Sequence, residues 1–234
     1  MSLDVVMLLA FLTVMIVVPL IMVLGRPVED SSAATDRPPA APSRSLFTSG
    51  RERRLWMWTL AVLVAIYATL GPVRELADFL RERNLLRLSS AAVLVTLSAV
   101  IATQWLRTRP GPREIATGIG VVAVYIASLI RIPIPEERTH LFEYGLVAIL
   151  IYQALLERRA NGRPLPLPAV VAWAAAVLLG WLDEGIQSLL PNRVYDLVDV
   201  GFNAVAATMA IAAILLLGWA RRWDVFNRES KADE

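Results

Sequence analysis

Residues Trp181 to Ala206 read WLDEGIQSLLPNRVYDLVDVGFNAVA and join the last two long apolar segments of the chain. The apolar residues on both sides predict two helices with a short turn between them. Ionisable groups are costly inside a membrane and usually face the protein interior or water. This stretch therefore predicts a polar site at one end of two adjacent helices. Its polar members are Asp183, Glu184, Gln187, Arg193, Asp196, Asp199 and Asn203.

The composition of the whole chain is typical of a membrane protein. Of the 234 residues, 56% are hydrophobic, and the mean hydropathy is +0.56. The apolar residues come in runs of about 20, the length at which a helix crosses the hydrocarbon core of a bilayer. Backbone groups in lipid must pair within the chain, and the alternating pattern of an outer-membrane barrel is absent. We therefore predict an all-α, polytopic transmembrane helix bundle. Because there is no cysteine, disulfides and thiolate sites are excluded.

The apolar segments divide the chain into about seven predicted spans. The first belongs to an N-terminal transmembrane helix over residues 1–25, retained because it lacks the basic start of a signal peptide. A linker rich in Pro and Ala covers 26–54, the bundle covers 55–222, and a charged tail covers 223–234, with fraying expected from Ala220. The spans are Val5–Leu24, Leu55–Leu70, Leu88–Leu106, Ile115–Ile130, His140–Leu156, Ala169–Leu190 and Asp196–Trp219.

The distribution of positive charge predicts the orientation. Most of the 23 Lys and Arg residues fall in the linker, in the loops after the third and fifth spans, and in the tail. Positive charge collects on the cytoplasmic side of a membrane, so we expect the N-terminus outside and the linker, tail and C-terminus in the cytoplasm. An aromatic belt at the inner boundary is expected from Trp56, Trp58, Trp105, Trp219 and Trp223.

This orientation brings three polar groups to the same outer level. The span from His140 runs inward, the next ends near Gln187, and the last starts at Asp196. His140, Glu143 and Tyr144 are spaced i, i+3 and i+4, so they share one helix face. Asp196, Asp199 and Asn203 are spaced i, i+3 and i+7, again on one face. We therefore expect these side chains to meet those of Asp183 and Glu184.

Some of these residues have a structural explanation. A carboxylate in the first turn of a helix is favoured by the helix dipole, which accounts for Asp196, and Asn203 could cross-bond neighbouring helices. For the set as a whole we favour a functional site. The catalytic candidates are His140, Asp183 and Glu184; the binding candidates are Glu143, Tyr144, Gln187, Arg193, Asp199 and Asn203.

The chemistry of this set allows more than one use. His140 could act as a general acid or base near neutral pH, with a neighbouring carboxylate to raise its pKa. A histidine with several carboxylates could also hold a divalent ion. Magnesium, calcium or manganese would suit such oxygen ligands better than zinc. No HExxH, GxSxG or phosphate-loop motif is present, so the sequence assigns no metal or cofactor.

At these residues the chain resembles the VanZ-like family of bacterial membrane proteins. ERTHLFEYG matches a histidine motif of that family through His140 and Tyr144. The second motif is matched at the family's spacing by Asp183, Glu184, Gln187, Pro191, Arg193, Asp199 and Asn203. Two positions depart from the pattern, because Asn192 and Ala206 stand where the family has glycine. The resemblance covers about the last half of the chain. It implies a protein of the bacterial inner membrane with a role in the cell envelope, and it names no substrate.

Three functions are open at this point. The first is binding of, or action on, an envelope lipid or lipid-linked small molecule at the outer polar site. The second is an accessory subunit of a larger membrane complex, for example respiratory or photosynthetic, contacted through residues 1–54. The third is a small transporter, which the lack of polar groups through the inner halves of the spans disfavours. The lipid bilayer is an expected partner of all three. Nucleic acid is not, because acidic residues interrupt the arginines of the linker.

Overall fold

The computed structural model describes residues 46–69, 82, 103, 105, 109–131, 135–189 and 195–232. The side chains of 135–140 and 228–232 are outside that description. The described part of the chain is all-helical, as predicted. Its long helices are α2 (Gly50–Thr69), α5 (Pro112–Arg131), α6 (Pro135–Ala160), α7 (Pro168–Gln187) and α8 (Leu197–Ala232).

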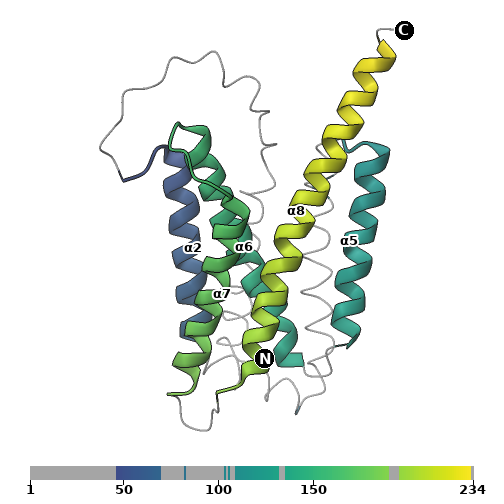
Figure 1. Ribbon diagram of the computed structural model, residues 1–234. Helices are drawn as coiled ribbons and strands as arrows, with labels where there is room; N and C mark the ends of the chain where they lie inside the picture. Colours follow the sequence, from purple (N-terminus) through teal and green to yellow (C-terminus); the bar gives the residue numbers. More distant parts are fainter. Residues whose placement is uncertain are drawn as a thin grey trace.

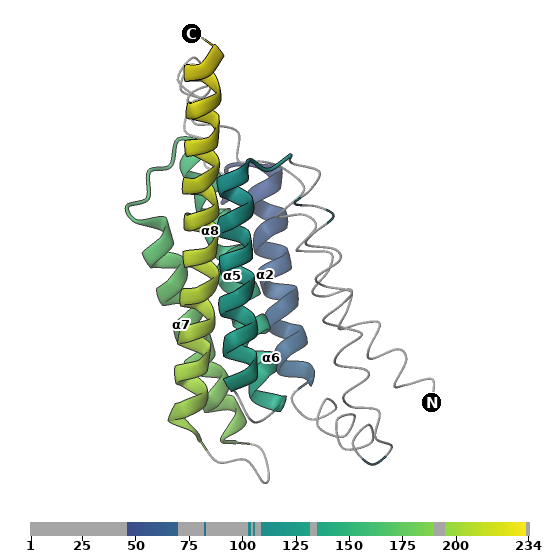
Figure 2. The ribbon, with the colours of Figure 1, turned by 90° about the vertical axis from the view of Figure 1, so that its right-hand side faces the viewer.

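The helices pack side by side with α6 at the centre. α6 contacts α2, α7 and α8, and α8 also contacts α7 and α5. In Figure 1, α2, α5 and α7 run downward from their first residue, whereas α6 and α8 run upward. Figure 2 shows α8 extending beyond the other helices at its C-terminal end. The start of α2 and the end of α6 therefore share one end of the bundle. The end of α7 and the start of α8 share the other end.

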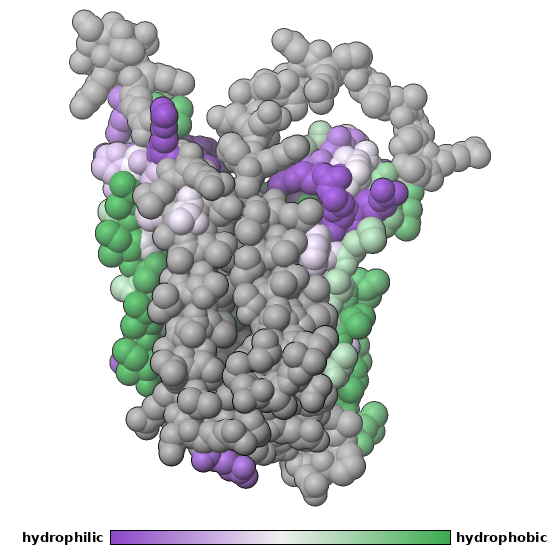
Figure 3. All heavy atoms as spheres, turned by 180° about the vertical axis from the view of Figure 1, so that it is seen from behind, coloured by the Kyte–Doolittle hydropathy of each residue, from purple (hydrophilic) through white to green (hydrophobic). Residues whose placement is uncertain are grey.

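The outer faces of the bundle suit a bilayer. Among the residues that the structure describes, three helical segments are long and apolar enough to cross a membrane: Pro112–Arg131, Pro168–Gln187 and Leu197–Asn227. Figure 3 shows hydrophobic residues along both flanks, between hydrophilic residues at the two ends. The apolar segment of α8 has 31 residues. Such a helix is about 46 Å long, and the hydrocarbon core is only about 30 Å thick. We conclude that this is a membrane protein and that α8 extends beyond the hydrocarbon.

Five of the predicted spans correspond to helices of the structure. The segments at 55–70, 115–130, 140–156, 169–190 and 196–219 lie in α2, α5, α6, α7 and α8 respectively. The segments at 5–24 and 88–106 lie outside the described residues, apart from Thr103 and Trp105. The count of seven spans and their orientation therefore stay predictions.

The predicted boundaries differ from the structure in three places. α6 begins at Pro135 rather than His140, because proline is well accommodated in a first helical turn. α2 begins at Gly50, within the predicted linker. The expectation that the chain frays from Ala220 is wrong. α8 continues to Ala232, and Ala220 and Asp224 are buried where α8 meets the start of α5.

Small residues let the central helices approach closely. Ala172, Ala176 and Gly180 are spaced i, i+4 and i+8 on α7, and all three are buried. A Cβ atom added at Gly180 would lie 2.7 Å from the Cβ of Asn203 on α8. Association of membrane helices depends on such close packing, since lipid tails are as apolar as the helix surface. Gly180 therefore sets the distance between α7 and α8.

We predict that Gly180→Ala destabilises the protein, because the new methyl group must push α8 away. Overpacking of this kind lowers the free energy of unfolding by about 1–3 kcal/mol, measurable by thermal unfolding in a mild detergent. Gly185→Ala is the matched control on the same helix, since a Cβ there meets no atom within 4 Å. Equal unfolding temperatures for the two variants would show that the contact at Gly180 does not hold the helices at this distance.

Candidate functional site

Polar side chains gather at two ends of the bundle. One end contains the end of α7 and the start of α8, where the sequence predicts a site, and the other contains the starts of α2 and α5. On α6, Tyr144 lies at the first of these ends and Glu157 at the second, about 20 Å apart along the helix axis.

The last turn of α7 places three polar side chains in the interior. Asp183, Glu184 and Gln187 have exposed fractions of 0%, 1% and 1%. The Nε2 of Gln187 donates a hydrogen bond of 3.1 Å to Oδ2 of Asp183. This bond is the i, i+4 pair that the sequence spacing predicts. The polar set of α7 thus faces the other helices rather than lipid.

Two tyrosines from different helices meet this turn of α7. Tyr144 of α6 is fully buried. Its hydroxyl lies 3.5 Å from the carbonyl oxygen of Leu179, and the hydroxyl of Tyr67 on α2 donates to the same oxygen at 3.3 Å. Both phenols also interact electrostatically with the carboxylate of Asp183. Asp183 therefore has uncharged polar side chains from three helices nearby, and Gln187 donates to it directly.

α8 contributes Asn203, and the residue before its first turn contributes a backbone amide. Asn203 is fully buried, and its Nδ2 donates a hydrogen bond of 3.2 Å to the carbonyl oxygen of Gly180. Its Oδ1 is buried and accepts no hydrogen bond from any residue that the structure describes. On α7, Oε2 of Glu184 accepts from the backbone N–H of Asp196 at 3.4 Å. The first turn of α8 therefore faces the carboxylate of Glu184.

The helix dipoles explain part of this arrangement. Asp183 and Glu184 lie in the C-terminal turn of α7, where the partial negative charge of the helix disfavours a carboxylate. The N-terminus of α8, with its partial positive charge, offsets this for Glu184. Gln187 and the two tyrosines, which interact with Asp183, are uncharged. We conclude that the stability of α7 does not account for two carboxylates at this position.

The remaining predicted residues are less buried or not described. Asp196 is exposed, and its Oδ1 accepts a hydrogen bond of 2.8 Å from the backbone N–H of Val198. It caps α8, in agreement with the structural explanation proposed for it. Glu143 and Asp199 are half-buried. The backbone of His140 lies in α6 one turn before Tyr144, with its side chain outside the description, and Arg193 lies outside the described residues.

We give the name end site to five buried residues together with the half-buried Tyr67: Tyr67, Tyr144, Asp183, Glu184, Gln187 and Asn203. Tyr67 was not predicted, because its place depends on how α2 packs against α6. Within the part of the chain that the structure describes, no three His, Asp or Glu side chains converge as a metal ion would require. The end site offers both donors and acceptors, and so suits a polar, hydroxyl- or amide-bearing ligand or the transfer of a proton.

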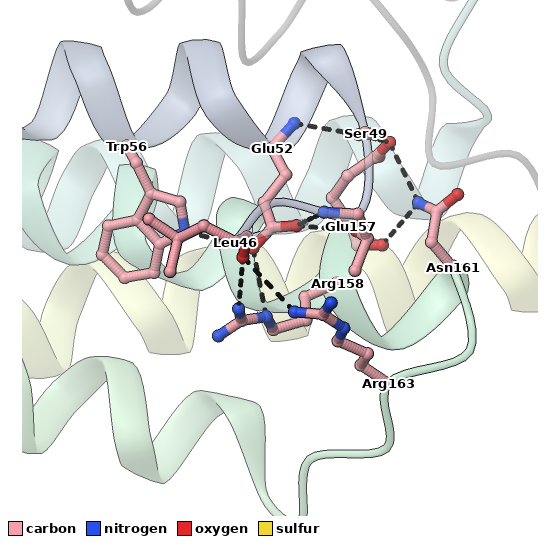
Figure 4. Close-up of polar contacts among 9 residues, drawn as sticks. Leu46, Ser49, Glu52, Trp56, Glu157, Arg158, Asn161 and Arg163 are labelled. Carbon is pink, nitrogen blue, oxygen red and sulfur yellow. Dashed lines mark hydrogen bonds and ion pairs between the residues drawn. The ribbon is translucent and has the colours of Figure 1, made fainter. Parts of the chain in front are cut away.

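The opposite end holds a second polar cluster, which the sequence reading missed. Figure 4 shows Glu52 of α2 and Glu157 of α6 among arginine, serine and asparagine side chains. Arg158 pairs with Glu52 at 3.1 Å and Arg51 pairs with Glu157 at 2.8 Å, so the two helices exchange ion pairs. Arg158 also donates to the carbonyl oxygen of Leu46 at 2.9 Å. This cluster, the α2–α6 clasp, fastens the start of α2 to the end of α6.

Both carboxyl groups of the clasp have a lowered pKa. Burial by itself would raise the pKa of Glu52, but hydrogen bonds from Thr48 and the charge of Arg158 outweigh it. For Glu157, burial is likewise outweighed by hydrogen bonds from Arg51 and Ser49. The charged forms are therefore the ones that stabilise the folded protein.

A third cluster, the α5–α8 clasp, fastens α5 to α8 at this same end. Glu114 is buried and accepts from Nη2 of Arg221 at 2.6 Å and from the indole Nε1 of Trp105 at 3.0 Å. Its backbone N–H donates to Asp224 at 3.0 Å. The sequence signal that could have predicted this clasp is an acidic residue at the start of one apolar segment, together with an arginine near the end of another apolar segment.

Comparisons with known proteins give no match among family models, curated proteins or solved structures.

The lowered pKa values predict how stability depends on pH. A carboxyl group whose pKa is lower in the folded state makes its full contribution to the stability of the fold above its unfolded pKa, near 4.5. That contribution is lost as the pH falls through the folded pKa. We expect the unfolding temperature to drop steeply below about pH 4.5. Glu52→Gln should lower stability at pH 7 by about 1–3 kcal/mol and reduce the response to acid.

Asp196→Asn is the control for this experiment, because asparagine caps a helix as well as aspartate does. It should respond to acid as the wild type does. An acid response of Glu52→Gln equal to that of the wild type would contradict the role given to the α2–α6 clasp.

Proposed function

We propose that this chain is a VanZ-like protein of the bacterial inner membrane that binds an envelope lipid or lipid-linked precursor at the end site. In this proposal the chain has about seven spans, the end site faces the outside, and the C-terminus is cytoplasmic. The motif residues of the resemblance that are described fall in or beside one cluster, which supports reading them as parts of one site.

The burial of two adjacent carboxylates carries the proposal. Asp183 and Glu184 are both inside the bundle, at the helix end that disfavours negative charge. A charged side chain costs about 2.5–3.5 kcal/mol at the centre of a membrane helix and less near a helix end, but Asp183 and Glu184 are also withdrawn from solvent into the bundle. A stable bundle could be built more cheaply with apolar residues at both positions. The presence of the pair is therefore best explained by a function.

The depth of the end site suits a ligand that arrives from the headgroup region. Trp181 and Tyr195 are exposed, and the Nε1 of Trp181 donates to the Tyr195 hydroxyl at 2.6 Å. Such side chains sit at the boundary between hydrocarbon and headgroups. Asp183 follows Trp181 by two residues, so the carboxylates lie close to this boundary. A sugar or peptide headgroup could reach them while its lipid chain stays in the membrane.

The chemistry proposed for the site divides into binding and proton transfer. Carboxylate oxygens and Oδ1 of Asn203 accept hydrogen bonds, while the tyrosine hydroxyls donate. We propose that His140 exchanges a proton with the ligand. Asp183 and Glu184 would assist it as the neighbouring carboxylates. Glu143, Arg193 and Asp199 would line the approach.

The second candidate function is an accessory subunit of a larger membrane complex. It is favoured by α8, which extends beyond the other helices (Figure 2) and exposes Trp223, Val225 and Phe226 next to its contact with the start of α5. Exposed large apolar residues on a protruding helix are typical of a contact surface.

We predict that the protein, purified gently from its native membrane, carries a lipid or envelope precursor detectable by non-denaturing mass spectrometry. Asp183→Asn keeps the volume and removes the charge, and the loss of a charged hydrogen-bond acceptor should lower occupancy about tenfold or more. His140→Ala should also lower it.

Asp196→Asn, outside the end site, should retain the ligand. If the Asp183 and His140 variants both kept the ligand at the wild-type level, the proposal would be wrong. A stoichiometric set of other subunits in place of a ligand would make the accessory function primary.

A further inference from the structure

The clasp end of the bundle separates acidic from basic side chains. Glu52, Glu114, Glu157 and Asp224 are turned inward and engaged in the two clasps. Arginines of the same end point outward, so its surface is cationic even though the whole chain carries a net charge of only +2. We call the outward set the basic collar: Arg53, Arg54, Arg109, Arg113, Arg159 and Arg222, all of them exposed.

Helix stability does not account for three of these arginines. Arg53 and Arg54 lie near the start of α2, and Arg113 is the second residue of α5. The partial positive charge of a helix N-terminus disfavours a cation there, by about 0.3–1 kcal/mol. Backbone N–H groups of these first turns already have partners, since that of Glu52 donates to Ser49 and that of Glu114 donates to Asp224. The exposed arginines, rather than the helix ends, would therefore hold an anion.

Aromatic side chains place the basic collar at the membrane boundary. Trp56 and Trp58 follow Arg54 by two and four residues, and Trp219 and Trp223 flank Arg222, with about half of each of the latter two side chains exposed. The guanidinium carbon of Arg113 lies 4.8 Å from the centre of the Trp223 ring. Guanidinium groups beside boundary tryptophans are at the depth of lipid phosphates.

We propose that the basic collar binds the phosphate groups of anionic phospholipids. The planar guanidinium matches phosphate geometry with two parallel hydrogen bonds, and basic residues next to the membrane attract anionic lipids. The site is separate from the end site and lies at the other end of the bundle. It stands whether or not the end site binds an envelope lipid.

The test compares lipid retention from vesicles or nanodiscs of phosphatidylcholine alone and with added phosphatidylglycerol. Wild-type protein should retain phosphatidylglycerol selectively in non-denaturing mass spectrometry, and its unfolding temperature should rise when that lipid is added. The selectivity should weaken in high salt, since exposed charges are screened. Equal retention of the two lipids by the wild type would overturn the proposal.

The double variant R53Q/R54Q separates lipid binding from a structural role. It should reduce the preference for phosphatidylglycerol about tenfold to thirtyfold, since each arginine near an anionic surface contributes about fivefold. In neutral detergent its unfolding temperature should equal or exceed that of the wild type, because two cations leave a helix N-terminus. R131Q, an exposed arginine at the C-terminal end of α5, is the control and should leave the preference unchanged. An unchanged preference in R53Q/R54Q, or an equal loss in R131Q, would refute the role of the basic collar.

Discussion

The close approach of α7 and α8 at Gly180 and Asn203 is the contact on which the rest of the structure depends. Only a residue without a side chain leaves room there, and the amide of Asn203 uses that room to donate to the carbonyl oxygen of Gly180. A hydrogen bond between membrane helices restricts both their distance and their relative position along the axis. It therefore fixes which residues of α7 lie opposite which residues of α8.

That alignment has consequences one turn further along α7. Asp183 and Glu184 are carried to the side where α8 begins and where Tyr144 and Tyr67 arrive from α6 and α2. Neutral donors and a helix N-terminus then make the burial of two carboxylates tolerable. The end site is thus a product of helix packing, and it holds its acidic groups where apolar groups would be more stable.

The two ends of the bundle handle charge in opposite ways. At the end site, acidic groups face inward among tyrosine, amide and backbone groups. At the other end, acidic groups face inward against arginines in the two clasps, and further arginines face outward beside tryptophans. At the end site the acidic groups lie among uncharged side chains and backbone groups, whereas the clasps use their acidic groups to join helices through ion pairs.

The sequence by itself determined the helical class, the membrane setting, and the helices that carry Tyr144, Asp183, Glu184, Gln187 and Asn203. These follow from local features: runs of apolar residues, and polar spacings that place side chains on one face of one helix. It also gave Asp196 a structural explanation, a carboxylate favoured by the helix dipole at the start of a helix, and the structure shows that Asp196 caps α8 from the position before its first residue. Only the tertiary structure decided that Tyr67 joins the end site, that Glu52, Glu114 and Glu157 are engaged in clasps, and that the chain after Ala220 stays helical. Each of these depends on contacts between residues about a hundred positions apart, such as Tyr67 with Leu179 or Glu114 with Arg221. Periodicity within a segment specifies which face of a helix is polar, but only the packing of several helices specifies what that face meets.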